Sequence, residues 1–172
     1  MLQFLKVFLD IVLWRRGPQD LPASPLLLAL AAAAYVVVSV VQLGLLDEPG
    51  RVWLVFIVLD PILLVGSVWL LLRLFNRRER FLQTATAVLG TGAVLGIVLS
   101  LPTQALLSLL KLGPESPVAG RAGLSLVVVF ALVTGRILKL ATDSNLFTGV
   151  ALSLTYFLVI NLLLELAAGR GA

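Results

Sequence analysis

Long stretches without charge are the feature that most constrains what this chain of 172 residues can fold into. Charged residues make up only 13% of the sequence, and they lie in clusters between apolar runs. Soluble domains carry about 25% charged residues. A helix needs about 20 consecutive apolar residues to cross a bilayer. The pattern therefore predicts an all-α integral membrane protein, with a single five-helix membrane domain over residues 24–167.

The five expected spans differ in how well they fit a crossing. The third comes from a longer uncharged run that Pro102 should divide, leaving a short surface helix after it. The fourth is short between Ala122 and Gly135, and is long enough only if Arg136 and Lys139 extend toward the headgroups. We expect spans at about 24–46, 52–72, 82–101, 122–141 and 144–164.

The N-terminal segment, residues 1–16, has the pattern of an amphipathic helix in the membrane interface. Its polar residues recur at helical spacing and leave a broad apolar face: Gln3, Lys6 and Asp10. Trp14 should lie at headgroup level. A signal peptide is the competing interpretation, and Asp10 disfavours it by interrupting the apolar region. Ser24 and Pro25 then predict the start of the first span.

The basic residues predict the orientation of the chain. With five spans, nine of the thirteen Lys and Arg residues fall on the side of the N-terminus. The positive-inside rule places that side in the cytoplasm and the C-terminus outside. The cluster "RLFNRRER" should orient the chain and contact anionic lipid headgroups, with a partner-binding patch as the alternative. The Ala/Leu/Arg-rich composition suits a bacterial inner membrane.

Two absences from the sequence limit its chemistry. The chain has no cysteine and no histidine, which excludes disulfides, thiolate nucleophiles, Cys or His metal sites and Ser-His-Asp triads. A Gly-rich phosphate loop is also missing. The basic residues lie at helix ends, where the bilayer rather than nucleic acid accounts for them. We therefore expect no catalytic set, metal or cofactor.

Asp60, in "FIVLDPILLV", is an acid at the centre of the second span. Such a group costs about 2.5–3.5 kcal/mol on insertion, which makes it a candidate functional residue. Arg136 should lie deeper toward the cytoplasm and extend to the interface, so we expect a hydroxyl partner rather than an ion pair. Counting residues from the inner end of each span puts four hydroxyls at the depth of Asp60: Tyr35, Thr91, Thr155 and Tyr156.

Pro61 gives the same stretch a structural interpretation. A proline frees the carbonyl four residues back, here that of Ile57, and kinks the helix. Asp60 and Pro61 then have two interpretations. One is a kinked helix that serves packing and carries a neutral acid, and the other is a relay for protons or a solute. A relay usually needs several ionisable groups in line, and the middle of these spans carries one acid. A single acid therefore favours the packing interpretation over the relay.

Small and polar residues elsewhere in the spans predict helix contacts. Gly92 and Gly96 form a small-xxx-small pair that lets another helix approach closely. Packing within one bundle is favoured over a homodimer seam, because such pairs are common in membrane helices. Asn161 should make a helix–helix contact or face a polar cavity.

Two stretches resemble the Yip-type (Ypt-interacting protein) membrane proteins, in particular their small bacterial members. They are "WRRGPQDLPASPLLLAL" and "RRERFLQTATAVLGTGAVLGIVLSLP". The resemblance covers about 12–165 as topology and implies a cytosolic N-terminus, five clustered spans and a short tail on the far side. Eukaryotic members are associated with small GTPases and vesicle traffic. No site residues transfer, because the motifs are not catalytic.

These observations lead to two functional hypotheses. The first is a non-enzymatic scaffold or assembly and trafficking-type factor of the Yip-domain kind, which acts through lipid, a membrane protein partner or a homo-oligomer. The alternative is a small transporter or channel subunit that uses Asp60 as a proton or cation site. A lipid-modifying enzyme is disfavoured, since His, Cys and paired acids are missing.

Overall fold

A computed structural model describes residues 2–45, 50–113 and 115–168, and every regular element in these ranges is helical. Five helical segments are long and apolar enough to cross a membrane, judged by length and composition. The expected all-α fold with five such segments is therefore confirmed. They are α2 (Pro25–Leu45), α3 (Gly50–Leu74), α4 (Phe81–Leu95) with its continuation, α6 (Pro117–Thr142) and α7 (Leu146–Ala168).

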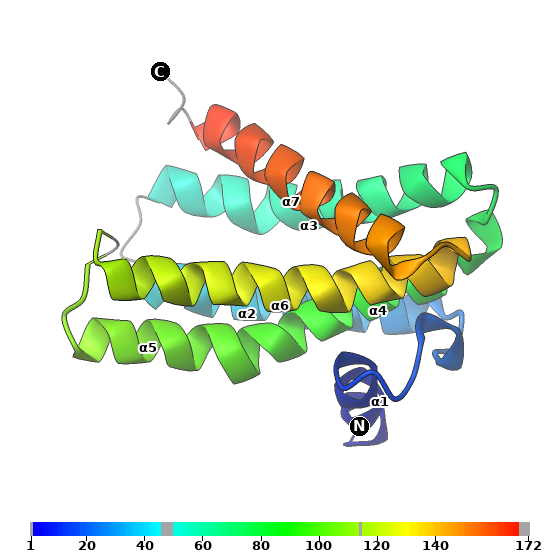
Figure 1. The fold of residues 1–172 in the computed structure, drawn as a ribbon, viewed down its shortest axis with the longest axis horizontal. Coiled ribbons are helices and arrows are strands. Elements are labelled where there is room, and N and C mark those ends of the chain that lie inside the picture. Colours follow the sequence, from blue (N-terminus) through cyan, green and yellow to red (C-terminus); the bar gives the residue numbers. More distant parts are fainter. Residues whose placement is uncertain (1, 46–49, 114, 169–172) are drawn as a thin grey trace.

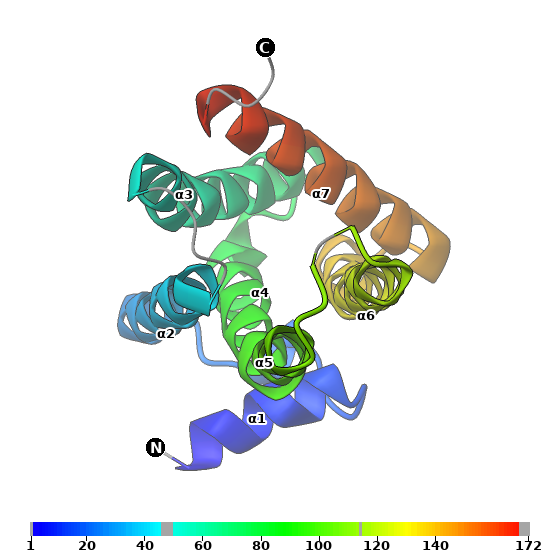
Figure 2. The ribbon, with the colours of Figure 1, turned by 90° about the vertical axis from the view of Figure 1, so that its left-hand side faces the viewer.

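Helix α4 occupies the middle of the bundle. Viewed along the long axis, it lies among α2, α3 and α6, while α7 crosses α3 and α6 diagonally (Figures 1 and 2). Ala85, Ala87 and Leu89 of α4 have no exposed surface. The small residues of "FLQTATAVLGTGAVL" explain this position, because they allow neighbouring helices to approach from several sides.

The third span runs further than predicted. After α4, a π-helical turn (η3, Gly96–Ser100) leads into α5 (Leu101–Leu109), which continues along the bundle axis (Figure 2). The chain therefore does not break at Pro102, whereas the location of the following helix near a membrane surface stays a prediction. Pro102 lies in the first turn of α5, where its missing N–H is tolerated, and the preceding π turn has already altered the hydrogen-bond register.

The fourth span begins earlier than predicted, so that it is long enough to cross a bilayer. Helix α6 starts at Pro117 instead of about Ala122, so that Arg121 lies within it. The Ser116 hydroxyl caps the helix by accepting a hydrogen bond from the Ala119 N–H at 3.1 Å. The Ser–Pro signal that predicted the start of α2 at Pro25 thus operates here as well.

The N-terminal helix α1 (Leu2–Val12) lies across the bundle axis (Figures 1 and 2). It packs on α4, and the ring of Phe8 occupies the space that a side chain at Gly90 would fill. Ile11 is also buried, whereas Leu13 and Trp14 are exposed. Part of the apolar face therefore contacts protein, and the location of α1 in a membrane interface stays a prediction.

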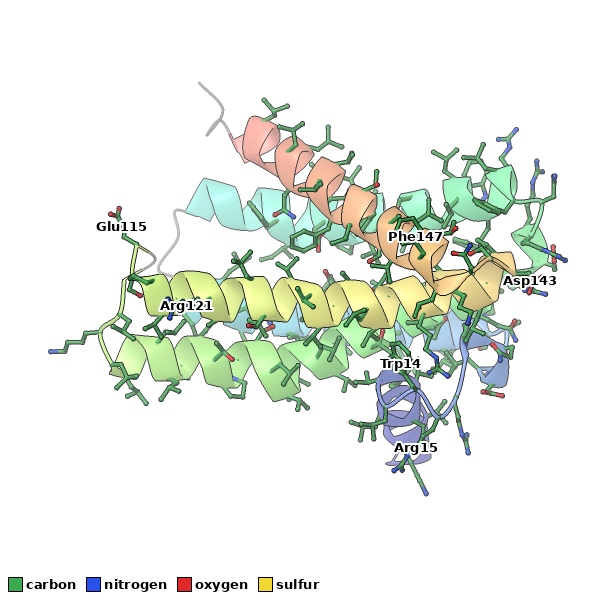
Figure 3. All side chains as sticks on the ribbon, in the orientation of Figure 1. Trp14, Arg15, Glu115, Arg121, Asp143 and Phe147 are labelled. Atoms are coloured by element: carbon green, nitrogen blue, oxygen red, sulfur yellow. The ribbon has the colours of Figure 1, made fainter. Side chains whose placement is uncertain are left out.

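The two ends of the bundle carry different elements. Trp14, Arg15 and Asp143 lie at one end together with α1, and Glu115 and Arg121 lie at the other (Figure 3). We call the first of these the α1 end. Helix α7 begins near the α1 end and runs away from it (Figure 1). The first predicted span was to end at residue 46, which lies outside the described residues.

Candidate functional site

A cavity of about 210 Å³ lies between α2, α3, α4, α6 and α7, and Asp60 is part of its wall. We call it the Asp60 cavity. Three phenylalanines contribute apolar walls: Phe56, Phe130 and Phe157. The polar groups come from four different helices, and they are Tyr35, Asp60, Thr134, Ser153, Tyr156 and Asn161. A mostly apolar hollow with a few convergent polar groups is typical of a small-molecule site.

Asp60 has the hydroxyl partner that its position in the span required. The Tyr35 hydroxyl donates a hydrogen bond to Oδ2 of Asp60 at 2.6 Å. Gly92 makes this geometry possible, because the Tyr35 ring lies 2.9 Å from the point where a Cβ of residue 92 would stand. The two residues singled out in the sequence, Gly92 and Asp60, thus contact the same side chain. Gly92 of α4 leaves space for Tyr35 of α2, and Tyr35 binds Asp60 of α3.

Tyr156 is the second tyrosine of the cavity, and its hydroxyl differs from that of Tyr35 in its hydrogen bonding. The oxygen is buried and has no hydrogen-bond partner among the described residues. Leaving a buried hydroxyl unpaired costs about 1–3 kcal/mol. Tyr156 also borders a second hollow of about 180 Å³, which lies between α3, α4, α6 and α7 and extends to Leu71 and Leu138. Tyr156 is thus one of four residues that border both hollows, with Leu64, Val88 and Thr134.

The structure does not bring every predicted hydroxyl to Asp60. Thr91 is buried, but it donates to the carbonyl of Ala87 in its own helix at 2.7 Å. Thr155 borders the second hollow instead. Residue counting fixed their depth but not the direction in which each side chain points around its helix. Thr134 and Ser153 were missed, although Ser153 precedes Tyr156 and Ile160 at helical spacing and could have been found from them.

Asn161 borders the Asp60 cavity, which is the second of the two positions expected for it. Its side-chain amide donates to the carbonyl of Phe157 at 2.7 Å, within the same helix. This bond fixes the side chain at the end of the cavity farther from the α1 end. Asn161 therefore adds polarity to the wall instead of joining two helices.

The neighbouring packing residues act within this chain. Gly96 accommodates Val38 of α2, so the Gly92–Gly96 face is covered by α2. Pro61 lies inside α3, which continues as one helix to Leu74. Pro61 borders a groove beside Ala32 of α2, so adjacent residues of α3 line different hollows.

Arg136 does not pair with Asp60. Its guanidinium lies over the Trp14 ring, 5.2 Å from the centroid, and donates to the carbonyl of Arg16 at 3.1 Å. Arg136 therefore fastens the segment after α1 to α6. The ion pairs within the described part of the chain involve Asp10 and Asp143, so Asp60 is left without a cationic partner there.

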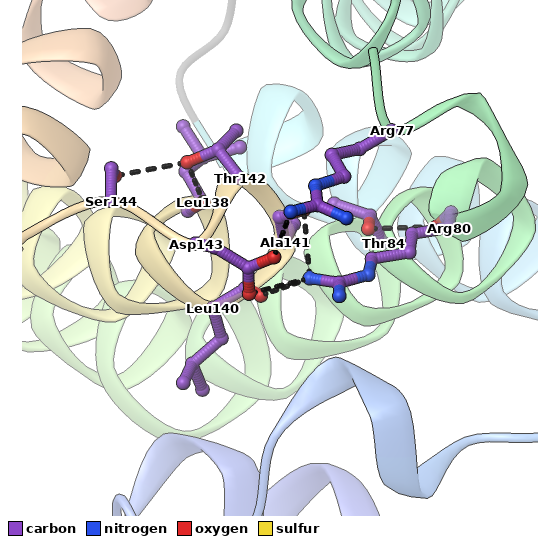
Figure 4. Close-up of polar contacts among 9 residues, drawn as sticks. All are labelled: Arg77, Arg80, Thr84, Leu138, Leu140, Ala141, Thr142, Asp143 and Ser144. Atoms are coloured by element: carbon purple, nitrogen blue, oxygen red, sulfur yellow. Dashed lines mark hydrogen bonds and ion pairs between the residues drawn. The ribbon is translucent and has the colours of Figure 1, made fainter. Parts of the chain in front are cut away.

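A second polar group, the Asp143 cluster, joins two turns at the α1 end (Figure 4). The carboxylate of Asp143 accepts Arg77 and Arg80, each at 2.8 Å. Arg80 also donates to the carbonyls of Leu140 and Ala141, which lie in the last turn of α6. Hydrogen bonding from Arg80 holds the pKa of Asp143 below its ordinary value.

This cluster gives part of "RLFNRRER" a structural role that the sequence did not reveal. The stretch had been interpreted as an orientation signal, yet Arg77 and Arg80 tie the α3–α4 turn to the α6–α7 turn. Nothing in the local sequence paired them with Asp143, which is about sixty residues away.

Two glycines missed by the sequence analysis set the closest approach of α6 and α7. A Cβ atom on Gly149 would overlap the carbonyl oxygen of Gly135, and one on Gly135 would stand 2.7 Å from the Cα of Val150. The two backbones therefore touch near the α6–α7 turn. The pair has no GxxxG spacing, because its members belong to different helices.

The Asp60 cavity offers binding chemistry more readily than acid–base catalysis. It contains one carboxyl group, and no group of three or more His, Cys, Asp or Glu residues that suits a metal ion occurs in the described ranges. A single carboxylate with hydroxyls and aromatic rings can hold a proton or a cation. Comparisons with protein-family models, with curated proteins and with solved structures give no match to this chain.

Proposed function

We propose that this chain is a non-enzymatic, multi-pass protein of the bacterial inner membrane that moves a proton or a small cation through the Asp60 cavity. In this proposal α1 lies on the cytoplasmic side, as the distribution of Lys and Arg predicts. The protein would then be a small transporter or a channel subunit.

One observation carries the proposal: the acid in the middle of α3 borders an open cavity together with a tyrosine hydroxyl that has no partner in the part of the chain that the structure describes. A residue that serves only packing needs no hollow beside it, because packed interiors leave few voids larger than water. Intramembrane acids that face a cavity commonly mark a solute or ion path. The second hollow beyond Tyr156 supports a path that extends along the bundle.

Buried residues lie beside the second hollow at the end of the bundle nearest α1. Leu72 has no exposed surface, and Ile137 has almost none. The backbone contact between Gly135 and Gly149 lies at the same end. The wall of the second hollow reaches Leu71 and Leu138, which are the chain neighbours of these two residues.

A scaffold of the Yip-domain kind is the second candidate, and the Tyr35–Asp60 hydrogen bond favours it. That bond gives a half-buried acid a partner without any ligand, as a packing device would. On this view Asp60 joins α2 to α3, and the protein acts through lipid, a membrane protein partner or a second copy. The resemblance of two stretches to Yip-type proteins also supports this candidate.

Reconstitution into liposomes separates the two candidates. Wild-type protein should carry a proton or monovalent-cation flux, followed with an internal pH dye or a potassium diffusion potential. Asp60→Asn should abolish that flux, since it removes the charge and keeps the shape. Asp143→Asn is the matched control, because it changes an acid outside the cavity, and it should retain the flux. Wild-type liposomes no leakier than empty ones would reject transport and leave the scaffold.

A further inference from the structure

We infer that the Asp60 cavity selects a small organic ammonium cation. This rests on the proposed function, because it names the solute class of the same site. The inference depends on the lining of the cavity, on the absence of a cation paired with Asp60 among the described residues, and on the size of the cavity.

The cavity wall is unusually rich in aromatic rings. Five aromatic side chains from α2, α3, α6 and α7 line it, and they include both tyrosines of the whole chain: Tyr35, Phe56, Phe130, Tyr156 and Phe157. An aromatic face attracts a cation within about 6 Å of the ring centroid, by about 2 kcal/mol or more when the site is desolvated. Several rings around one space form the kind of cage that recognises substituted ammonium groups.

Asp60 supplies the opposite charge. Its Oδ2 accepts a hydrogen bond from the Tyr35 hydroxyl, and this bond orients the carboxyl group. Two arginines of the bundle lie over tryptophans outside the cavity: Arg73 lies 5.2 Å from the Trp69 ring centroid, and Arg136 lies 5.2 Å from that of Trp14. Among the described residues no cationic side chain pairs with Asp60, so a cationic ligand would meet no competitor from these residues.

The size and the polarity of the walls favour an organic cation over a metal ion. A cavity of about 150 Å³ holds benzene, so about 210 Å³ suits a ligand of roughly six to ten non-hydrogen atoms. Hard metal cations require about six or more oxygen ligands in close contact. The oxygens of the Asp60 cavity come from side chains on four different helices and are spread among apolar rings, and only Asp60 carries a charge.

Choline and its uncharged carbon isostere, 3,3-dimethyl-1-butanol, are the probes that test this inference. They share shape and hydroxyl group and differ in charge. Titration calorimetry on the full chain in nanodiscs should show saturable binding of choline, with the isostere at least tenfold weaker. Potassium chloride at the same concentration should not displace choline. Equal binding of choline and the isostere, or no saturable choline binding, would overturn the inference.

Variants locate the binding in the cavity. Phe130→Leu and Asp60→Asn should each weaken choline binding at least tenfold, because one removes a ring and the other the charge. Phe147→Leu is the matched control: it changes a ring on α7 that is 82% exposed and does not line the cavity, and binding should be unchanged. Size-exclusion profiles confirm that each variant is folded. Unaltered binding in folded Phe130→Leu would contradict the aromatic cage.

The outcomes also distinguish this inference from the proposed function. A flux that depends on Asp60 while choline neither binds nor competes would reject the ammonium ligand and keep transport. Choline binding that depends on Asp60 and Phe130, without any flux in liposomes, would keep the site and reject transport.

Discussion

Helices α6 and α7 are joined tightly at one end and separated by a cavity further along. Near their turn, Gly135 and Gly149 bring the two backbones into contact, and the Asp143 cluster fixes the turn itself. Further from the turn, Ala131 and Ser153 border the Asp60 cavity. Figure 1 shows α7 diverging from α6 over this distance. One pair of helices thus contains both a firmly packed stretch and a stretch that leaves space for a ligand.

The two aspartates in these regions illustrate the same contrast. Asp143 is exposed and holds two arginines, whereas Asp60 has one hydroxyl partner inside the bundle. Exposed ion pairs contribute little to stability each, but together they fix the geometry of the turn. Asp60, on α3, forms no ion pair within the described residues. The contrast is therefore between an ion-paired turn and an acid beside a cavity.

The largest effect is expected from breaking the packed stretch. Gly149→Leu places a side chain where the carbonyl of Gly135 lies, and it should destabilise the protein by at least about 2–3 kcal/mol. Thermal unfolding in detergent, with size-exclusion chromatography, measures this. Gly66→Leu is the control, because no heavy atom lies within 4 Å of the added Cβ position. Equal melting temperatures for the two variants would show that the α6–α7 contact is not limiting.

Removing the partner of Asp60 should have the next largest effect. Tyr35→Phe leaves the carboxyl without its hydrogen-bond donor and should lower stability by about 1 kcal/mol. A double-mutant cycle with Asp60→Asn, measured by unfolding in detergent, should give a coupling of about 0.6–1.7 kcal/mol. Additive effects of the two substitutions would mean that the hydrogen bond contributes nothing to stability.

The other tyrosine of the cavity should respond with the opposite sign. Tyr156→Phe removes a buried hydroxyl that has no partner among the described residues, so stability should stay constant or rise by up to about 1 kcal/mol. Comparing its melting temperature with that of Tyr35→Phe tests the distinction directly. A loss as large as that of Tyr35→Phe would show that the Tyr156 hydroxyl is satisfied in solution.

The smallest effect is expected at the exposed Asp143 cluster, and it should depend on pH. The pKa of Asp143 is lower in the folded protein than in the unfolded chain. Its contribution to stability is therefore complete above the unfolded pKa and is lost as pH falls through the folded pKa. Asp143→Asn should lower the melting temperature by about 1–3 °C at neutral pH. The difference from wild type should vanish in acid; a difference that persists there would exclude the charge as its cause.

The sequence predicted those features that depend on one helix at a time. The length of the apolar runs predicted the five long helices, and the Ser24–Pro25 pair predicted the start of α2. Depth counting brought Tyr35 and Tyr156 into the layer of Asp60, but it placed Thr91 there as well. Counting gives height along a helix, whereas contact also requires the rotation of each helix about its own axis.

Features that depend on pairs of distant segments were not predictable in this way. The contact of Gly135 with Gly149 depends on the crossing of two helices, and the Arg80–Asp143 pair depends on which turns lie together. The π turn at Gly96–Ser100 was also missed, because Pro102 suggested a break where the chain only changes its hydrogen-bond register.

The docking of Phe8 onto Gly90 has a consequence for biogenesis. The two residues are about eighty positions apart, and at roughly 5–20 residues per second the ribosome releases the first several seconds before the second. During that interval α1 has been made but its binding surface on α4 has not. Until α4 has been made, the apolar face of α1 lacks this partner, and the headgroup layer of a bilayer is an environment that accepts an amphipathic helix in the meantime.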